Sequence, residues 1–202
     1  MKCILGIGNP GTQFRNTRHN VGFQLLDNFA LGNSLKFIPS KFDFSFSEGE
    51  LDKIPFVLIK PTTYVNNSGL AAKQCLNLYN IDIEDFLVIV DDVNLQFGEL
   101  RLRKAGGDGG HNGLSSIIYH LNSEDFPRLR FGIGGEFDKG RLSGYVLSPF
   151  SKEELTVIND LSDLVISLLE SFIKDGYHAM LTRYSRIKKK EIQNDKTNDE
   201  NE

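Results

Sequence analysis

The sequence predicts one α/β domain built on a mixed, twisted β-sheet with helices on both faces. Short apolar runs alternate along the chain with segments whose apolar residues recur at helical spacing, which is typical of sheets covered by helices. The chain of 202 residues also fits a single core, because single cores stop growing beyond roughly 250 residues. Hydrophobic residues make up 40% and charged residues 25%, close to the globular average. We therefore expect one domain over residues 1–187 and a disordered, charged tail over residues 188–202.

The first half of the chain predicts four strands and two helices. The run KCILGI ends in glycine and predicts a buried strand, whereas the alternation in DFSFSEGEL predicts an edge or antiparallel strand with one wet face. Asn20 is a candidate N-cap for the helix that follows it. We expect the strands at 2–7, 36–39, 43–51 and 55–60, and the helices at 21–30 and 70–80.

The second half contains the clearest fully buried strand, FLVIVDD, in which an apolar run precedes two carboxylates. Alternation in ELRLRK places Arg101 and Arg103 on one face. From Lys152 to Phe172, apolar residues recur at helical intervals and indicate an amphipathic helix. Beyond Lys188 this periodicity stops, which predicts disorder. We expect the remaining strands at 86–92, 99–104 and 128–135, and the helices at 114–121, 152–172 and 177–184.

Charge and cysteine content exclude several classes of protein. The net charge of −4 argues against a protein that coats nucleic acid, although it permits one that binds a few phosphates locally. Cys3 and Cys75 belong to no CxxC or Cys/His cluster, so neither a structural zinc site nor a disulfide framework is expected. No apolar run reaches the ~18 residues of a membrane span, and the N-terminus is unlike a signal peptide. We expect a soluble cytoplasmic protein.

Two glycine motifs resemble nucleotide-binding loops but lack the features those loops need. Gly6, Gly8 and Gly11 form GxGxxG after the first strand, yet TQFRNTRHN lacks helical spacing and Pro10 removes one amide donor. A dinucleotide site also needs a carboxylate that binds the ribose, about 20 residues after the glycines and at a strand end. The residue at that spacing is Asp27, which lies in a helical pattern. The segment AGGDGGHNG lacks the GK[ST] of a P-loop. We interpret the first glycines as serving a tight strand-to-loop turn.

A set of polar side chains remains at the predicted strand ends and in the loops. In α/β sheets, loops beyond the carboxyl ends of the strands converge on one crevice, so these side chains are candidates for a shared pocket. The set comprises Asn9, Arg18, His19, Asn20, Asn66, Asn67, Asp91, Asp92, His111 and Asn112.

The chemistry of this set indicates direct activation of water. A histidine with a carboxylate partner and no candidate nucleophile is typical of a general base, and the carboxylate holds one ring nitrogen as a donor. His19 is the favoured histidine, the case for His111 is evenly balanced, and His120 and His178 lie in helical patterns where structural roles are expected. A metal site remains a minority interpretation because close ligand pairs are missing.

Four motifs in this order resemble the bacterial-type peptidyl-tRNA hydrolases. They are GIGNPGTQFRNTRHNVGF (6–23), KPTTYVNNSG (60–69), DDVNLQFGELRLRKAGGDGGHNGLSSI (91–117) and RLRFGIGG (128–135). The resemblance implies a monomeric, metal-free and cofactor-free esterase. Such an enzyme cleaves the ester between a peptide and the 3′-terminal ribose of tRNA, and so recycles tRNA from prematurely released chains.

The resemblance also implies roles for individual residues. His19 matches the catalytic base and Asp91 the carboxylate that orients it. The amides that contact the peptide and the attacking water match Asn66 and Asn112, and the residue that separates blocked from free aminoacyl ends matches Asn9. The aromatic pair that flanks the tRNA terminus matches Phe14 and Tyr64, and the clamp on the 5′ phosphate matches Arg101 and Arg130.

Physical chemistry is compatible with these implied roles. The ester is already activated, so one general base and good positioning suffice. Asn112, beside flexible glycines at the opening of a helix, is expected to present backbone N–H groups to the oxyanion. The chain departs from the family pattern at Phe14, Tyr64, Val65 and Asn94, which affects fine substrate positioning.

Two alternative functions remain open at this point. One is an RNA-binding module on the same fold that has lost catalysis, against which the joint presence of the base, its partner and the two amides argues. The other is a dinucleotide-dependent oxidoreductase, which rests on GxGxxG alone.

Overall fold

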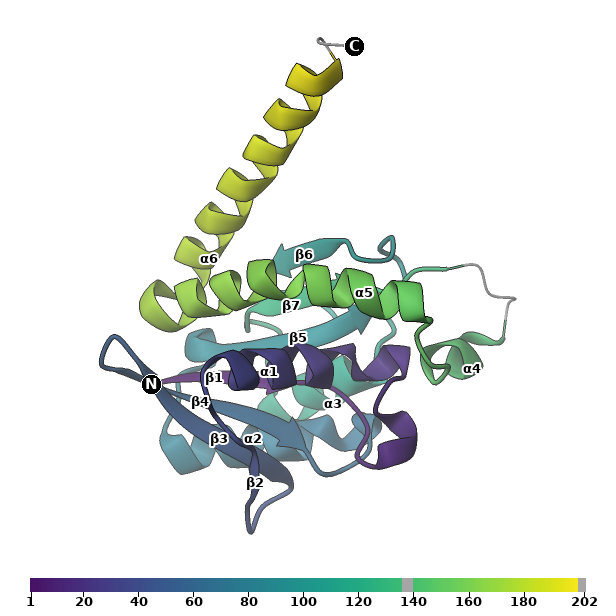
Figure 1. Ribbon diagram of the computed structural model, residues 1–202. Coiled ribbons are helices and arrows are strands. Elements are labelled where there is room, and N and C mark those ends of the chain that lie inside the picture. The colour runs from purple at the N-terminus through teal and green to yellow at the C-terminus, as the bar shows by residue number, and fades with distance from the viewer. Residues whose placement is uncertain (136–139, 200–202) are drawn as a thin grey trace.

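Seven strands form one mixed sheet in the order β2-β3-β4-β1-β5-β7-β6 (Figure 1). Strands β1, β4, β5 and β7 run parallel to one another, while β2, β3 and β6 pair antiparallel at the two edges. The computed structural model describes residues 1–135 and 140–199. The strands are β1 (Lys2–Gly6), β2 (Ile38–Pro39), β3 (Phe44–Leu51), β4 (Ile54–Pro61), β5 (Phe86–Asp92), β6 (Leu100–Arg103) and β7 (Arg128–Gly132).

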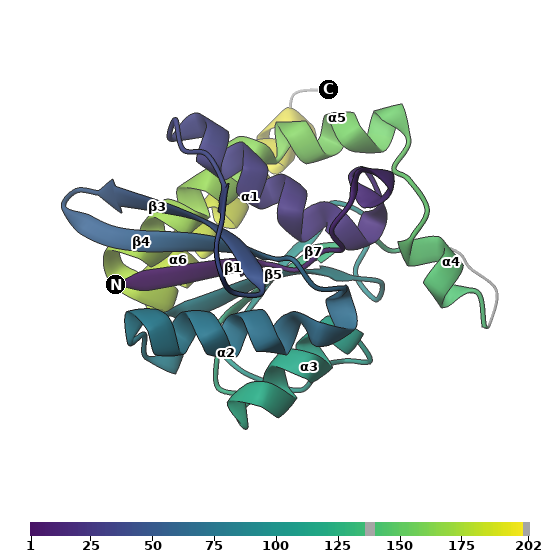
Figure 2. The same cartoon turned by 90° about the horizontal axis from the view of Figure 1, so that it is seen from below.

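Helices cover both faces of the sheet, as the alternation of elements predicts (Figure 2). One face packs against α1 (Val21–Gly32), α5 (Lys152–Asp160) and the first part of α6 (Ser162–Asp199), and the other against α2 (Ser68–Tyr79) and α3 (Asn112–Leu121). The short helix α4 (Leu142–Val146) lies beyond one end of the sheet (Figure 1). Every residue of β5 is buried because helices lie on both sides of it. The predicted single α/β domain is therefore confirmed.

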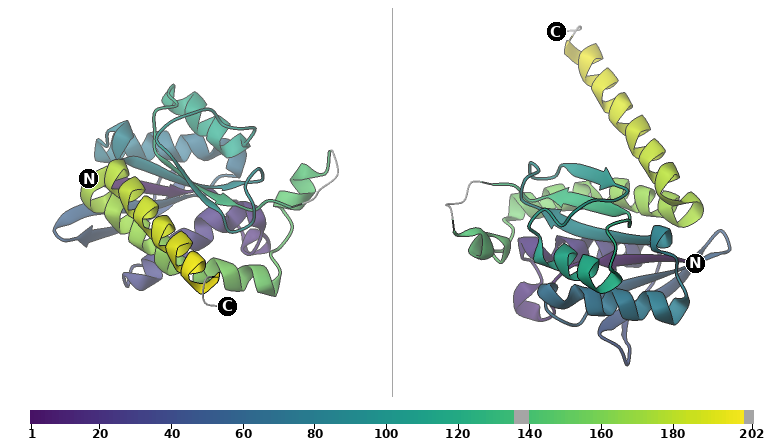
Figure 3. Two further views of the ribbon diagram at one scale, coloured as in Figure 1. Left: turned by 90° about the horizontal axis from the view of Figure 1, so that it is seen from above. Right: turned by 180° about the vertical axis from the view of Figure 1, so that it is seen from behind.

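The C-terminal helices differ from the sequence prediction. The single helix expected over 152–172 is divided, since α5 ends at Asp160 and α6 begins at Ser162. Inside α6, Gly176 has φ 78° and ψ −168°, a conformation that bends the helix and that glycine adopts at low cost. The expected second helix over 177–184 is therefore the start of the arm beyond this bend (Figure 3).

Helix α6 extends as far as Asp199, into the segment from residue 188 that the sequence predicts to be a disordered tail, and residues 200–202 lie outside the described part. The physical reason is composition: no glycine or proline follows Gly176, and lysine, glutamate and glutamine are good helix formers even without an apolar stripe. Met180 and Tyr184 are the last side chains assigned to the core. The rest of α6 projects from the domain (Figure 3). No helix among the described residues has the length and apolar character to cross a membrane.

A close approach of α1 to the sheet brings the first loop to the carboxyl ends of the strands. A Cβ on Gly22 would lie 2.6 Å from the carbonyl oxygen of Ile7 and 2.7 Å from that of Ile89, and a Cβ on Gly6 would lie 2.5 Å from the oxygen of Gly22. These distances are shorter than real Cβ contacts, so only glycine permits the helix to pack there. The short 3₁₀ helix η2 (Arg18–Asn20), which leads into α1, is thereby held beside β5.

Candidate active site

A cleft of about 750 Å³ lies at the carboxyl ends of β1 and β5. The converging loops predicted from the sequence therefore meet, and they bring most of the candidate residues into one place. The predicted site residues that line the cleft are Asn9, His19, Asn66, Asp91, Asp92, His111, Asn112 and Arg130.

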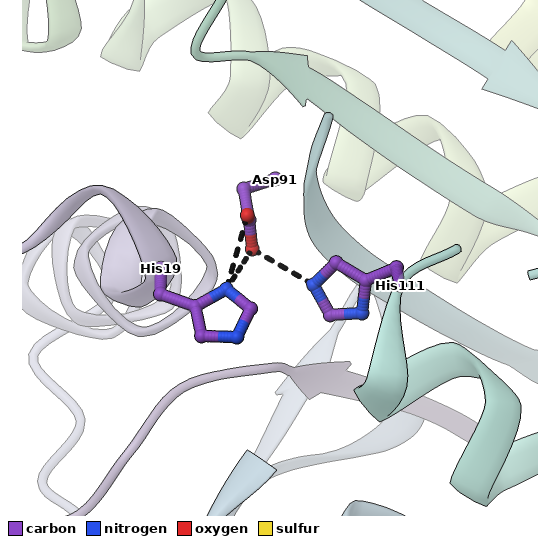
Figure 4. Close-up of side chains that lie close together, drawn as sticks. All are labelled: His19, Asp91 and His111. Carbon is purple, nitrogen blue, oxygen red and sulfur yellow. Dashed lines mark hydrogen bonds and ion pairs between the residues drawn. The ribbon is translucent and has the colours of Figure 1, made fainter. Parts of the chain in front are cut away.

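Asp91 lies at the centre of this site and contacts two histidines (Figure 4). Nδ1 of His19 is 2.9 Å from Oδ1 and 3.0 Å from Oδ2 of the carboxylate, and Nε2 of His111 is 3.0 Å from Oδ1. The Asp91 side chain is only 2% exposed, because Asp91 lies near the end of β5, a strand in which every residue is buried. The pairing of His19 with Asp91, which the motifs imply, is present in the structure.

Asp91 is ionised in this arrangement. Burial by itself raises the pKa of the carboxyl group, but the opposing influence of His111 and His19, through Coulombic attraction and hydrogen bonding, holds the pKa well below its usual range. An ionised carboxylate can only accept hydrogen bonds. Each ring nitrogen that faces Asp91 must therefore carry a proton.

His111 is fixed by a second interaction as well. It is the N-cap of α3, and its Nδ1 accepts hydrogen bonds from the backbone N–H groups of Gly113 at 3.1 Å and Leu114 at 3.2 Å. Nδ1 must then be unprotonated while Nε2–H donates to Asp91. The hydrogen bonds thus select one neutral tautomer of this imidazole.

His19 has the opposite tautomer. In the neutral ring, Nδ1–H donates to Asp91 and the lone pair lies on Nε2, and no described residue forms a hydrogen bond with that atom. The ring lies at the cleft with its centroid 4.9 Å from that of His111. A nitrogen with a lone pair at a cleft, backed by a buried carboxylate, is the arrangement that a general base requires.

This trio is also the group within the described residues that could offer ligands to a metal ion, since its ligating atoms lie within 4.8 Å of one another. In the hydrogen-bonded arrangement, however, the nitrogens that face Asp91 carry protons. A metal bound between them would have to displace both protons, and the Nδ1 of His111 would still be occupied by helix α3. The trio could therefore hold a metal ion only after both protons are released.

Asn9 presents one amide group to the cleft in a fixed orientation. Its Oδ1 accepts a hydrogen bond from the backbone N–H of Val65 at 2.9 Å, so Nδ2 is the atom left for the cleft. The backbone of Asn9 is held in turn by Asn20, which accepts from its N–H and donates to its carbonyl, both at 2.9 Å. Asn20 makes no side-chain cap of α1, contrary to the sequence prediction, because its amide is used here.

Packing of α2 on α3 brings Asn66 and Asn112 to the same cleft. Gly69 permits that packing, since a Cβ there would lie 2.1 Å from the carbonyl oxygen of Ser116, and its N–H donates to Ser116 Oγ at 3.0 Å. Asn66 lies in η3 (Val65–Asn67), just before α2, and Asn112 is the first residue of α3. Both side chains are exposed and line the cleft.

One detail of the oxyanion prediction is corrected. The backbone N–H groups of Gly113 and Leu114 donate to His111 Nδ1, and that of Ser115 donates to the carbonyl of His111. These donors at the start of α3 are used within the cap and are not offered to a ligand. No described residue accepts from the backbone N–H of Asn112, so that N–H and the side-chain amide of Asn112 are the donors that this helix end can present.

Phe14 and Tyr64 form the aromatic pair that the resemblance predicts. Their ring centroids lie 6.2 Å apart and the ring planes meet at 87°, an edge-to-face contact. Tyr64 is 58% exposed, which leaves much of its ring open to a ligand. Neither residue belongs to the lining of the cleft, so the pair lies outside it.

Arg101 and Arg130 are directly opposite each other on β6 and β7, as a shared clamp would require. Their environments differ, however. Arg101 forms an exposed ion pair with Glu99 at 3.0 Å, whereas Arg130 is largely buried, pairs with Asp92 at 2.9 Å and also donates to the carbonyl of Gly107. The sequence did not reveal Asp92 as a partner for Arg130.

The glycine pattern is explained by packing. Gly6 allows the contact with α1, a Cβ on Gly8 would meet the ring of Phe23, and Gly11 has a positive φ of 110°. The segment after Gly11 forms two 3₁₀ turns instead of a helix. The rejection of a dinucleotide site is consistent with this arrangement.

His120 has the structural role expected for it, since its Nδ1 contacts the carbonyl of Ser116 at 2.9 Å.

Comparison with known proteins identifies the class as a hydrolase that acts on an ester bond. The model of a family described as peptidyl-tRNA hydrolase matches residues 3–194. A peptidyl-tRNA hydrolase of Exiguobacterium sibiricum is 40% identical over 185 residues, which cover 92% of this chain and 100% of the relative. That of Clostridium beijerinckii is 38% identical and covers 93% and 97%. The chain belongs to the peptidyl-tRNA hydrolase family, as its motifs predict.

Solved structures agree with this assignment. The crystal structure of a peptidyl-tRNA hydrolase from Acinetobacter baumannii is similar with a TM-score of 0.81 and 32% identity, covering 86% of this chain and 89% of that one. A complex of peptidyl-tRNA hydrolase with N-propanol gives a TM-score of 0.83 at 32% identity, covering 91% and 94%. Because these relatives are named hydrolases, the alternative of a non-catalytic RNA-binding module is not favoured.

Proposed function

We propose that the chain hydrolyses the ester between the peptide and the 3′-terminal ribose of peptidyl-tRNA, with His19 as general base and without a metal ion. The observation that supports this most strongly is the lone pair on His19 Nε2, held at the cleft by the buried, ionised Asp91. Family membership supports the substrate class. By the same likeness we expect a cytoplasmic monomer that recycles tRNA.

The proposed reaction needs only proton transfer and positioning. His19 Nε2 takes a proton from a water molecule, and the oxygen of that water bonds to the carbonyl carbon of the ester. The resulting tetrahedral intermediate collapses when the bond to the ribose oxygen breaks, and the protonated His19 returns its proton to that oxygen. Asp91 stabilises the imidazolium between these two events. A general base contributes about 10²–10⁴-fold, which suits an ester that is already activated.

The amides around the base supply neutral hydrogen-bond partners for the peptide. Asn112 donates to the developing oxyanion from its side chain, and Asn66 contacts the peptide backbone on the other side of the cleft. Asn9 Nδ2 donates to the acyl carbonyl that a blocked amino end carries, and a free ammonium group offers no acceptor there. This is the physical basis we propose for selecting blocked over free aminoacyl ends.

The surroundings of the cleft suit the tRNA part of the substrate. Phe14 and Tyr64 provide ring surfaces on which terminal bases can stack. Arg101, with Arg130 beside it, provides the local positive charge for a phosphate that the acidic chain as a whole lacks. We propose that these residues bind the acceptor end and take no part in bond cleavage.

The test is hydrolysis of an N-acetyl-aminoacyl-tRNA measured beside the same tRNA with a free amino group, each with and without EDTA. We expect turnover of the blocked substrate, little action on the free one, and no effect of the chelator. Loss of activity with EDTA that returns with added metal would overturn the metal-free mechanism. Binding of the tRNA without any hydrolysis would favour the RNA-binding module instead.

A further inference from the structure

We propose that Arg18 is a positioning residue that sets substrate specificity, because it anchors the apolar wall formed by α4 to the loop that carries His19. The inference rests on the proposed function, since it assigns that wall to the peptide part of the substrate. Arg18 immediately precedes His19, so a group fixed to Arg18 is also fixed relative to the base.

The wall itself is defined by the lining of the cleft. Leu142, Val146 and Leu147 line the cleft together with the polar residues. The exposed fractions of Leu142 and Leu147 are 40% and 41%. Helix α4 contains only five residues and none of them is fully buried, although Tyr145 and Val146 are partly buried against the core. So short a helix gains little from packing alone, and contacts made from outside it contribute to its position.

Arg18 supplies that attachment through five hydrogen bonds. One terminal nitrogen donates to Pro149 O at 2.6 Å, to Ser148 Oγ at 2.9 Å and to Ser148 O at 3.5 Å. The other donates to both carboxylate oxygens of Glu154, at 2.7 and 2.8 Å. The side chain is only 12% exposed, which reduces screening of this ion pair by solvent. The planar guanidinium thus binds Glu154 through one nitrogen and the 148–149 segment through the other, and a lysine has only one nitrogen for both.

The guanidinium also stacks on α4 directly. Its Cζ lies 4.8 Å from the ring centroid of Tyr145 and 5.3 Å from that of Phe150. The hydroxyl of Tyr145 donates to the carbonyl of Ile133, just after β7, and fits there because Gly135 has no side chain. Arg18 therefore links α4 to the loop of the base, while Tyr145 links it to the end of β7.

The backbone beside Arg18 is paired with the same segment. The N–H of Arg18 donates to Ser148 O at 3.1 Å, and that of Phe150 donates to Asn16 O at 2.9 Å. Glu154 is meanwhile held by the capping box of α5, in which its carboxylate accepts from the backbone N–H of Ser151. The ion pair thus joins the loop of His19 to a helix that is anchored in the core through Ile158.

The experiment compares two substrates that differ only in the acyl part, one carrying N-acetylglycine and the other a blocked peptide of several leucines. In Arg18→Met we expect KM for the leucine peptide to rise about tenfold, KM for N-acetylglycine to rise less than about threefold, and kcat to stay within about threefold for both. Glu154→Gln retains the capping box, since glutamine serves at that position, and we expect the same pattern with a smaller amplitude. Arg183→Met, on the exposed part of α6, is the matched control and changes neither constant.

Hydrogen exchange provides a readout that needs no activity. We expect the amides of residues 142–150 to exchange faster in Arg18→Met and Arg18→Lys, while those of β5 keep their protection. If KM for both substrates rises equally, if kcat falls as KM stays constant, or if exchange over 142–150 is unchanged, the proposal is overturned. If the wild-type protein cleaves neither substrate, the proposed function fails, and the exchange measurement alone then decides whether Arg18 anchors α4.

Discussion

The two histidines that contact Asp91 show how one carboxylate can give two imidazoles different tasks. His111 has both ring nitrogens engaged, one by Asp91 and the other by the start of α3. Within the described part of the chain, His19 has only Nδ1 engaged, and its Nε2 is left at the cleft. The difference arises from the elements that carry them, a helix N-terminus for His111 and a 3₁₀ turn for His19. Reactivity here depends on what the second nitrogen of each ring contacts.

The largest effect is expected for His19→Ala. Removal of the proposed base should lower kcat by about 10²–10⁴-fold with KM nearly unchanged, because only the proton transfer is lost. The measurement is multiple-turnover hydrolysis of N-acetyl-aminoacyl-tRNA, with circular dichroism as the control for folding. A folded variant that retains wild-type kcat would remove His19 from the mechanism and make the two histidines equivalent.

Asp91→Asn should have the next largest effect, on the order of 10²-fold in kcat. An asparagine amide has no charge to stabilise the imidazolium, and it replaces one acceptor oxygen of Asp91 by an NH₂ donor. Single-turnover rates would check this, and tRNA affinity is expected to stay the same. A change of less than about threefold in the rate would show that the buried carboxylate is structural only.

His111→Asn separates capping from the contact with Asp91. Asparagine is a good N-cap, so the free energy of unfolding should change by less than about 1 kcal/mol. Because Asp91 loses one donor and is less firmly oriented, we expect kcat to fall about tenfold, well short of the effect of His19→Ala. Urea unfolding and steady-state rates measure the two quantities. A loss of kcat as large as that of His19→Ala would contradict the division of tasks.

A smaller effect is expected at Arg101, which lies outside the group of His19, Asp91 and His111. Arg101→Ala should raise KM a few-fold, leave kcat unchanged and reduce the slope of log KM against log salt by about one, the value for one lost phosphate contact. Lys41→Ala, at an exposed position near the opposite edge of the sheet, serves as a control for charge. If Arg101→Ala alters kcat and leaves the salt slope as in the wild type, the assignment to phosphate binding is wrong.

The lowered pKa of Asp91 predicts how stability depends on pH. A carboxyl group whose pKa is lower in the folded state stabilises that state above the unfolded value of about 3.9, and this contribution is lost as pH falls toward the folded value. The wild type should therefore lose more free energy of unfolding than Asp91→Asn as the solution is acidified below about pH 4. Urea titrations at several pH values measure this difference. Parallel curves for the two proteins would contradict the pKa direction.

Much of the fold follows from local pattern. The buried run of β5, the alternation in β3 and β6 and the apolar spacing of α3 were sufficient to predict those elements. The bend at Gly176 falls between the helices expected at 152–172 and 177–184. The division at Leu161 and the helical continuation of α6 were not predicted, because apolar periodicity does not report every break in a helix or whether a polar segment keeps its helix.

The site was predictable to the extent that its residues follow strand ends. Asp91 at the carboxyl end of β5 and His19 in the first loop were identified for that reason, and the structure brings them together. The contact of His111 with Asp91, the partnering of Arg130 with Asp92 and the contact of Arg18 with Glu154 were not predicted. Each depends on the three-dimensional approach of segments 20 to 136 residues apart, which one sequence does not encode in any local pattern.

The most direct test of the account is the ¹⁵N chemical shifts of the histidine ring nitrogens, measured by NMR near neutral pH. The hydrogen bonds predict opposite neutral tautomers, with a proton on Nδ1 and none on Nε2 in His19, and the reverse in His111. Observation of that pair would support a base poised at the cleft. If His19 instead carries its proton on Nε2, that nitrogen has no lone pair at the cleft to receive a proton from water, and the proposed mechanism is contradicted.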